Sequence, residues 1–156
     1  FFGFYNAIIT HDEIKGQVRL EDLSGKDVLV VKGWPEAHYL RDQYPEIKVV
    51  EVESTLDGLT KVSFKQYDYA FVSFPTATHL IQEHGLTGLR VAGTGGDISS
   101  GAVMVHKDAE MLRNLVDKAL ASITEEERRS IQRRWIPGLS SFESIFAKRV
   151  ELSKKE

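Results

Sequence analysis

The sequence predicts an α/β protein with a mostly parallel sheet flanked by helices, followed by a wholly helical C-terminal part. Between residues 28 and 92, short apolar runs alternate with stretches of helical periodicity, as in strands joined by crossover helices. The run at residues 28–31 is continuously apolar, which suits a strand that is covered on both faces of a sheet. Beyond residue 106, the apolar residues recur only at helical spacing.

Four strands are expected from the apolar runs at residues 28–31, 47–52, 69–72 and 89–92. The first helix begins near Pro35, because proline is favoured at the first helical position, and it ends before Pro45. Ser54 and Asp57 resemble a capping box and mark the start of the second helix. Pro75 opens the third helix.

The glycine-rich residues 93–96 are expected to form a flexible turn after the fourth strand. They do not make a dinucleotide-binding loop, because Ile98 stands where the last glycine should be, and no lysine follows as in a P-loop. A fifth strand is expected at residues 102–105. Helices are then expected at residues 111–123, 124–136 and 140–150, the second of them with a capping box of Thr124 and Glu127.

Composition narrows the classes of function. The chain has 156 residues, 42% of them hydrophobic, and a net charge of −3 from 20 basic and 23 acidic side chains, which excludes intrinsic disorder. Without a basic excess to neutralise phosphates, nucleic acid is not an expected partner. No run of about 18 apolar residues is present, so we expect membrane contact only through segments outside this chain. The absence of cysteine excludes disulfides.

Catalytic and metal-binding residues have no strong candidate in the sequence. His79 and His84 stand five residues apart, which places them on different helical faces instead of at metal-ligand spacing. Ser73 lacks the flanking glycines of a nucleophile elbow, although a Ser-His-Asp triad of distant residues stays open. We therefore expect no catalytic residue, no metal and no cofactor.

Ligand binding is better supported, by turns at the carboxyl ends of the expected strands. Residues 32–35, 53–55 and 73–76 each lead into a helix N-terminus, whose N–H groups and dipole favour an anion such as a carboxylate. Ligands of open α/β sheets bind at this edge. Trp34 and Phe74 add aromatic surface there. Ordinary helix starts after strands produce the same pattern, so a purely structural role for these turns stays open.

Several segments resemble the bacterial extracellular solute-binding proteins of family 3, which have the type 2 periplasmic-binding fold. Residues 23–33 match the pattern L-x-G-K-x-V-x-V-x-x-G, and the match continues at residues 44–45, 54–59 and 67–70. The closing helices of the version fused to sensor kinases and diguanylate cyclases resemble residues 120–126 and 131–135. The segment in which the chain enters the second lobe of that fold is similar to residues 5–10.

The resemblance implies a two-lobed Venus flytrap of which this chain is an N-terminally truncated part. Residues 1–11 would enter from a missing first lobe, residues 12–100 would be the second ligand-binding lobe, and residues 101–136 would return to the first lobe. Residues 137–156 would form a C-terminal linker helix. The hinge would consist of paired strands at residues 8–11 and 103–107. The chain starts with Phe1 instead of methionine, which agrees with this expectation.

The resemblance also implies a ligand site made of Gly33, Trp34, Pro35, Ser73, Phe74 and Thr76. Gly33 and the N–H groups of Trp34 and the following helix match the family's carboxylate-facing turn. Ser73 stands where amino-acid binders of the family usually place an aspartate for the ligand's α-ammonium. Serine supplies no negative charge, so an ordinary amino-acid ligand would lack its usual partner here.

The function implied is that of an extracytoplasmic sensing domain of a signal-transduction receptor, a histidine kinase or a diguanylate cyclase. It would close on a small carboxylate or amino-acid-like ligand in the periplasm, at the outer face of the inner membrane. One alternative is the solute-binding subunit of an ABC importer. Another is a dehydratase on the same fold, with Glu36 and Glu53 as the candidate proton-transfer groups. A lobe that serves only as an interaction module is a third.

The apolar stripe within residues 111–123 leads us to expect self-association. In the implied domain this stripe packs on the first lobe, so without that lobe it is partly uncovered. We therefore expect this chain to self-associate as a homodimer.

Overall fold

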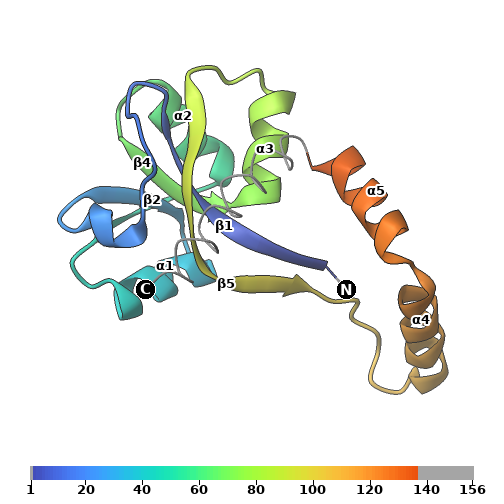
Figure 1. The fold of residues 1–156 in the computed structure, drawn as a ribbon. Helices are drawn as coiled ribbons and strands as arrows, with labels where there is room; N and C mark the ends of the chain where they lie inside the picture. Colours follow the sequence, from blue (N-terminus) through green and yellow to red (C-terminus); the bar gives the residue numbers. More distant parts are fainter. Residues whose placement is uncertain (1, 137–156) are drawn as a thin grey trace, which may run out of the picture.

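The computed structural model describes residues 2–136, which form a five-stranded sheet and helices around it (Figure 1). The strand order is β3-β2-β4-β1-β5. The strands are β1 (Phe2–His11), β2 (Asp27–Val31), β3 (Lys48–Val52), β4 (Tyr69–Ser73) and β5 (Leu89–Gly101). β2 pairs in parallel with β3 and β4, whereas β1 runs antiparallel to both of its neighbours. The predicted α/β class is confirmed, with β1 making the sheet mixed.

Three helices follow the parallel strands, and two more follow the sheet. The first three are α1 (Pro35–Gln43), α2 (Thr55–Ser63) and α3 (Phe74–Glu83), each beginning within about one turn of its predicted start. Helices α4 (Glu110–Ser122) and α5 (Glu125–Trp135) project from the sheet as an arm (Figure 1). A short 3-10 helix, η1, covers Leu20–Leu23. In the described part of the chain, no helix has the length and apolar character needed to cross a membrane.

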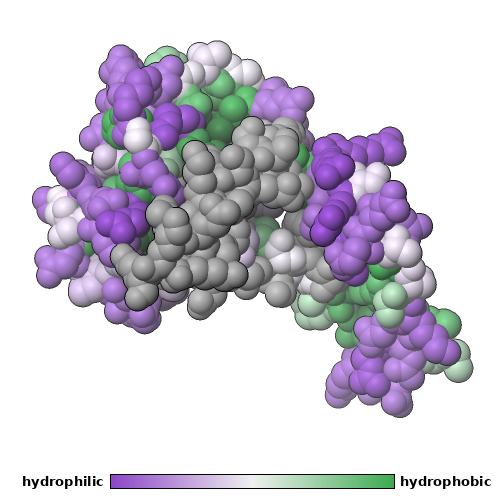
Figure 2. Space-filling view, viewed as in Figure 1, coloured by the Kyte–Doolittle hydropathy of each residue, from purple (hydrophilic) through white to green (hydrophobic). Residues whose placement is uncertain are grey.

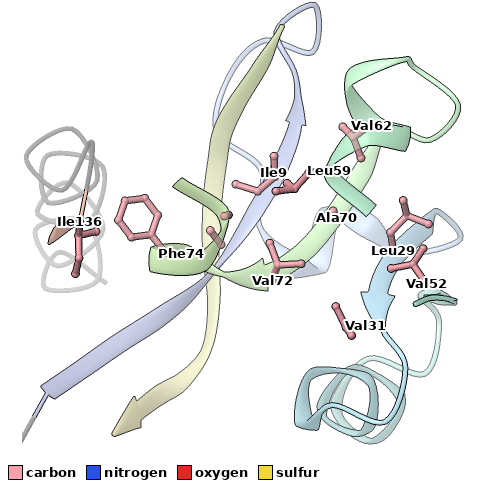
Figure 3. Close-up of a cluster of buried hydrophobic side chains, with 12 residues drawn as sticks. Ile9, Leu29, Val31, Val52, Leu59, Val62, Ala70, Val72, Phe74 and Ile136 are labelled. Atoms are coloured by element: carbon pink, nitrogen blue, oxygen red, sulfur yellow. The ribbon is translucent and has the colours of Figure 1, made fainter. Parts of the chain in front are cut away.

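The core consists of two apolar layers, one on each face of the sheet. Successive residues of β1 alternate between the layers: Ala7 and Ile9 belong to one and Ile8 to the other. Helices α2 and α3 cover the first layer, part of which is drawn in Figure 3. Helix α1 and η1 cover the second layer. β2 is buried on both faces from Val28 to Val31, which explains why it is a continuous apolar run in the sequence.

The glycine-rich residues 93–96 lie inside β5 and do not form the predicted turn. Gly93 and Gly95 are paired with Ile8 and Asn6 of β1. Their missing side chains let another segment approach the strand: a Cβ at Gly93 would lie 1.8 Å from the carbonyl oxygen of Val18. A Cβ at Gly95 would lie 2.4 Å from Leu20 Cδ1. The glycines therefore allow close packing against β5. Local sequence rules predict a turn here, because glycine is common in turns.

The predicted fifth strand at residues 102–105 is wrong, and so is the predicted hinge pairing. β5 ends at Gly101, where it is paired with Phe2, and residues 102–105 adopt no regular structure. The predicted hinge strand at residues 8–11 instead pairs with residues 89–93 of β5. The physical reason is that a strand needs a partner. At Phe2 the described part of β1 has no residue left that would pair beyond Gly101.

Ser54 caps the N-terminus of α2, and its removal is the first testable change. Its Oγ accepts a hydrogen bond from the Asp57 N–H at 3.1 Å, whereas the Asp57 carboxylate pairs with Lys61 at 2.9 Å. Only half of the expected capping box therefore forms here, while the box of Thr124 and Glu127 forms in full. We expect Ser54→Ala to lower the free energy of unfolding by about 1 kcal/mol in urea titrations. Ser54→Thr keeps the accepting oxygen and should lose less; equal losses would contradict the capping role.

Tyr44, at the end of α1, carries a second prediction. Its hydroxyl donates to Glu21 Oε1 at 3.2 Å, and its ring lies 6.0 Å from that of Tyr39. Loss of hydration, with smaller contributions from Tyr39 and Glu21, raises the pKa of Tyr44 from its usual 10.0 to about 12. Since the folded pKa is the higher one, this contribution to stability is complete below pH 10 and disappears as the pH rises through about 12.

Alkaline titration of tyrosinate absorbance checks this shift. We expect the difference between the unmodified protein and Tyr44→Phe to contain a phenol that ionises near pH 12. Tyr69 has a raised pKa as well, chiefly through desolvation, so the difference spectrum is needed to assign the transition. A difference that titrates at the ordinary value would contradict the partial burial of Tyr44.

Candidate functional site

The carboxyl ends of three parallel strands meet at one edge of the sheet. β2, β3 and β4 point the same way, and α1, α2 and α3 begin directly after them (Figure 1). The N-terminus of α2 is capped by its own Ser54 side chain. The N-caps of α1 and α3, Trp34 and Ser73, make no side-chain capping hydrogen bond. At this edge, α1 and α3 therefore present helix starts that can attract an anion.

The turn between β2 and α1 contains three of the residues expected in the site. Gly33 has a φ of +73°, a conformation that favours glycine, and is exposed. The Trp34 N–H donates to the carbonyl oxygen of Val31 at 3.3 Å, so it is engaged within the turn instead of facing a ligand. The Trp34 side chain is 45% exposed beside the exposed Pro35 and offers aromatic surface.

The turn between β4 and α3 contains the other three. Ser73 is buried, and its Oγ lies 3.2 Å from the Oγ1 of Thr76, which donates to it. Phe74 is only 2% exposed, and its ring points toward Ile136 (Figure 3). The expectation that Phe74 offers a surface for a ligand is therefore wrong. As the first residue of α3, Phe74 packs in the layer beneath α2 and α3 instead.

Two buried side chains that the sequence did not select for ligand binding, Asn6 and Glu36, stand out in the structure. Each is 8% exposed. Within residues 2–136, Asn6 Oδ1 and Glu36 Oε2 have no hydrogen-bond partner. Buried polar atoms are nearly always paired, so each of these oxygens calls for an explanation. The sequence indicates Glu36 only as a candidate proton-transfer group, and it contains no local signal for Asn6.

Asn6, Glu36 and Ser73 lie on the same face of the sheet and at the same edge. Asn6 is directly opposite Ser73 in the pairing of β1 with β4. Ser73 comes two residues after Phe71, so both side chains point to the face that α1 covers. The ring of Tyr39 in α1 stacks on Phe71 with centroids 6.3 Å apart.

The position of Glu36 follows from that stacking. A crossover helix runs antiparallel to the strands it joins, so a step toward the start of α1 is a step toward the ends of β2 and β4. Glu36 precedes Tyr39 by almost one turn and therefore lies farther toward the carboxyl end of β4 than Tyr39 does. Glu36 also lies four residues before the buried Leu40, on the inner side of the helix. A carboxylate at that spacing from an apolar helix face was the signal available in the sequence.

A hollow lies away from this edge, between α5 and the end of β5. It has a volume of about 490 Å³, and its lining is apolar, with Pro75, Val103, Ile131, Trp135 and Ile136 among its residues. In the part of the chain that the structure describes, no three histidine or carboxylate side chains are placed to hold a metal ion. The hollow beside α5 thus offers apolar surface, whereas the sheet edge presents the polar side chains described above.

Comparisons with known proteins agree with this architecture. No family model matches the chain. The virulence sensor protein BvgS of Bordetella pertussis is 25% identical over 131 residues, which cover 83% of this chain and 10% of that protein. The crystal structure of the periplasmic VFT2 domain of the same sensor superposes with a TM-score of 0.66 and 22% identity, covering 86% of this chain and 57% of that one. The chain is thus homologous to a part of BvgS.

Two further solved structures share the fold. A histidine kinase sensor domain with similarity to periplasmic binding proteins has a TM-score of 0.69 and 22% identity, over 86% of this chain and 60% of that one. An arginine-bound ArgBP mutant from T. maritima has a TM-score of 0.63 and 19% identity, over 80% and 57%. These proteins are described as sensors or binding proteins and not as enzymes. The fold of this chain is that of type 2 periplasmic-binding, or Venus flytrap, domains.

Proposed function

We propose that this chain is the larger part of a periplasmic small-molecule-sensing domain of a signal-transduction receptor. The observation that carries the proposal is the polar site at the carboxyl edge of the sheet. Two helix starts without side-chain caps lie there, and the buried, unpaired oxygens of Asn6 and Glu36 belong to the same edge of the sheet. The chain shares its fold with sensor domains, and it spans about a tenth of the length of BvgS and about three-fifths of the matched solved chains.

We propose that residues 12–100 are one ligand-binding lobe and that residues 1–11 and 101–136 connect it to another. The exposed apolar side chains of α4 support this division. Met111 is 78%, Leu112 51% and Leu115 60% exposed, and Figure 2 shows hydrophobic surface on the arm that carries α4. A second lobe would cover these side chains. Without it, the same stripe favours a homodimer. The linker helix proposed at residues 137–156 lies outside the described residues.

The ligand in this proposal is a small carboxylate or an amino-acid-like molecule. The starts of α1 and α3 would attract its anionic group, with Gly33 letting the backbone turn tightly beside it. Trp34 would supply an apolar wall, and Ser73 and Thr76 hydroxyl groups for hydrogen bonds. The arginine-bound state of ArgBP supports an amino-acid-like ligand for this fold. No nucleic acid is involved.

Signalling in this proposal rests on closure of two lobes around the ligand. A ligand that contacts both lobes favours the closed state by the difference between its affinities for the two states. Closure would move α5 and the residues after it toward the output module, for which the matched sensor domain suggests a histidine kinase. None of the proteins compared above is described as a diguanylate cyclase. Contact with the membrane would come from segments outside this chain.

The importer subunit is the second candidate, because arginine-binding proteins share the fold of this chain. A receptor and an importer subunit would bind ligand at the same edge, so ligand binding does not distinguish them. The coding sequence after residue 156 does. An encoded membrane span and kinase module would support the receptor, and a stop codon would support the importer. Catalysis is not part of either proposal.

A thermal-shift screen of the complete two-lobed domain tests the proposed function. Binders among small carboxylates and amino acids should raise the melting temperature, since ligand at 100 times its Kd stabilises by about 2.7 kcal/mol. Trp34→Ala should reduce the shift, because it removes aromatic surface at the site. Phe64→Ala removes a 73% exposed aromatic side chain elsewhere and should leave the shift unchanged. If no compound shifts the transition, the interaction-module reading replaces the sensing domain.

A further inference from the structure

We propose that the apolar hollow between α5 and the end of β5 is the docking site of residues 139–147 of this same chain. These residues follow α5 by a few positions, lie outside the described residues 2–136, and contain Phe142, Ile145 and Phe146. Docking there would hold the segment that leaves the domain against the start of α3.

The hollow is an apolar surface that the described residues leave open. It has a volume of about 490 Å³ and is lined by Pro75 of α3, by Val103 after β5, and by Ile131, Trp135 and Ile136 at the end of the chain's described part. Val103 is 56%, Ile131 46% and Trp135 70% exposed. Apolar side chains that are exposed together are typical of a surface that another segment covers.

The course of the chain at the end of α5 leads the following residues past this hollow. Ile136 lines the hollow and is itself 7% exposed, packed in the same apolar layer as Phe74. Its φ of −117° and ψ of +95° are extended, so the chain departs from the helix direction there. Pro137 and Gly138 come next in the sequence. Proline does not continue a helix and glycine permits a tight turn, so a change of direction is favoured at this point.

The length of the connection favours docking within one chain over docking of a second copy. Five residues separate Ile136 from Phe142, and the chain between them spans at most about 21 Å. A short tether of this kind gives the segment an effective concentration in the millimolar range beside the hollow. A second copy reaches the same local concentration only in concentrated solution.

Residues 139–147 match the hollow in polarity and in charge. Phe142, Ile145 and Phe146 stand three and four positions apart, so in a helix they would share one face. An amphipathic helix with such a face is a common occupant of apolar grooves. Glu143 is the only charged residue of the segment, whereas residues 128–134 of α5 include four arginines and no acidic residue. The charges of the segment and of α5 are therefore complementary.

A docked segment would connect the candidate ligand edge with the chain that leaves the domain. Pro75, in the wall of the hollow, is the second residue of α3, and its neighbours Ser73 and Thr76 belong to the candidate site. A ligand that shifts the start of α3 would then shift the docked segment as well. This consequence rests on the proposed function, whereas the docking itself does not.

A cysteine scan locates the segment, because this chain contains no cysteine of its own. Val103→Cys places a thiol on the hollow and is combined with one cysteine at each position from 139 to 147. A disulfide joins only residues whose Cα atoms approach to about 4.4–6.8 Å. Leu112→Cys is the matched control, since Leu112 is similarly exposed (51%) but lies on α4, away from the hollow. The fraction of bridged chain is read on non-reducing gels after mild oxidation.

Acrylamide quenching of Trp135 fluorescence gives a second measurement. Trp34→Phe serves as the background, because it leaves Trp135 as the only tryptophan. A docked segment shields the Trp135 ring. We expect the double change Phe142→Ser and Phe146→Ser to raise the quenching constant at least about twofold, because it removes the apolar side chains that cover the hollow. Ala147→Ser, in the same segment, should leave the constant unchanged.

We expect Val103→Cys to form bridges within one copy, at positions three or four apart, and Leu112→Cys to form far fewer. Bridges found only between copies would contradict the proposal and assign the hollow to a second copy. Equal quenching in all variants, without bridges, would show that the segment does not dock. Protection of Trp135 that appears only in the complete two-lobed domain, and that the double change does not alter, would assign the hollow to the other lobe. None of these measurements uses a ligand, so their failure leaves the proposed function standing.

Discussion

Replacement of Phe71 by alanine is expected to lower the free energy of unfolding by about 3–5 kcal/mol. The side chain is fully buried in β4, and its ring stacks on Tyr39 with centroids 6.3 Å apart. The ring also lies against β5, where a Cβ at Gly95 would be 3.3 Å from Phe71 Cε2. Truncation would leave a cavity between α1 and the sheet. The neighbouring residue of β5, Gly95, has no side chain that could fill it.

Denaturant unfolding measures this loss, and Phe64→Ala is the matched control. Phe64 follows α2 and is 73% exposed, so its truncation removes the same atoms without opening a cavity. We expect the control to change stability by less than about 0.5 kcal/mol. The Phe71→Ala transition should shift its midpoint with an unchanged slope. Similar midpoints for the two variants would contradict the described core.

We expect Gly93→Ala to cause a second large loss of stability. The added Cβ would lie 1.8 Å from the Val18 carbonyl oxygen, far inside van der Waals contact. The Val18 segment is not free to withdraw, because its N–H donates to the carbonyl oxygen of Ala92 at 2.9 Å. Arg90 holds the same loop by donating to the carbonyl oxygen of Ile14 at 2.8 Å. We expect a loss of about 3 kcal/mol, measured by thermal or urea unfolding.

Gly58→Ala provides the comparison for that variant. Gly58 lies in α2, and a Cβ there would be 3.3 Å from Val52 Cγ2, a side-chain atom that can move. Alanine also favours a helix over glycine by about 1 kcal/mol, which offsets slight crowding. We expect Gly58→Ala to change the free energy of unfolding by no more than about 1 kcal/mol. If Gly93→Ala were as mild as Gly58→Ala, the close approach of Val18 to β5 would not exist in the folded protein.

Local patterns were enough to predict the central βα units. The apolar run before Gly33, the proline at position 35 and the cap at Ser54 are signals carried by neighbouring residues. The structure contains β2, α1, β3 and α2 where these signals placed them. Such signals work because both faces of β2 are covered and because the helix starts follow simple capping rules.

The errors lie where pairing between distant residues decides the structure. Residues 93–96 read as a turn because glycine usually breaks elements, yet β1 supplies a partner that makes them part of β5. Residues 102–105 have good strand propensity and no partner among the described residues. Whether a segment forms a strand depends on the segments that pair with it in the sheet. The residues next to it in the sequence do not reveal those partners.

Part of the candidate site was predictable, because two of its turns directly follow predicted strands. The turns at Gly33 and Ser73 follow from the positions of β2 and β4, so both were placed correctly at one edge. Phe74 was misassigned because it is buried in a cluster that includes residues distant in the chain, among them Ile9 and Ile136. Asn6 was missed because it comes to Ser73 only through the antiparallel pairing of β1 with β4.

Hydrogen–deuterium exchange of the complete two-lobed domain, with and without a binder from the thermal-shift panel, tests the central claim most directly. The claim is that ligand binds at the carboxyl edge of this sheet, at the starts of α1 and α3. We predict that ligand slows exchange at residues 33–37 and 73–77 and leaves the opposite ends of these helices unchanged. Unaltered exchange at both helix starts, with protection confined to the apolar hollow beside α5, would contradict the claim.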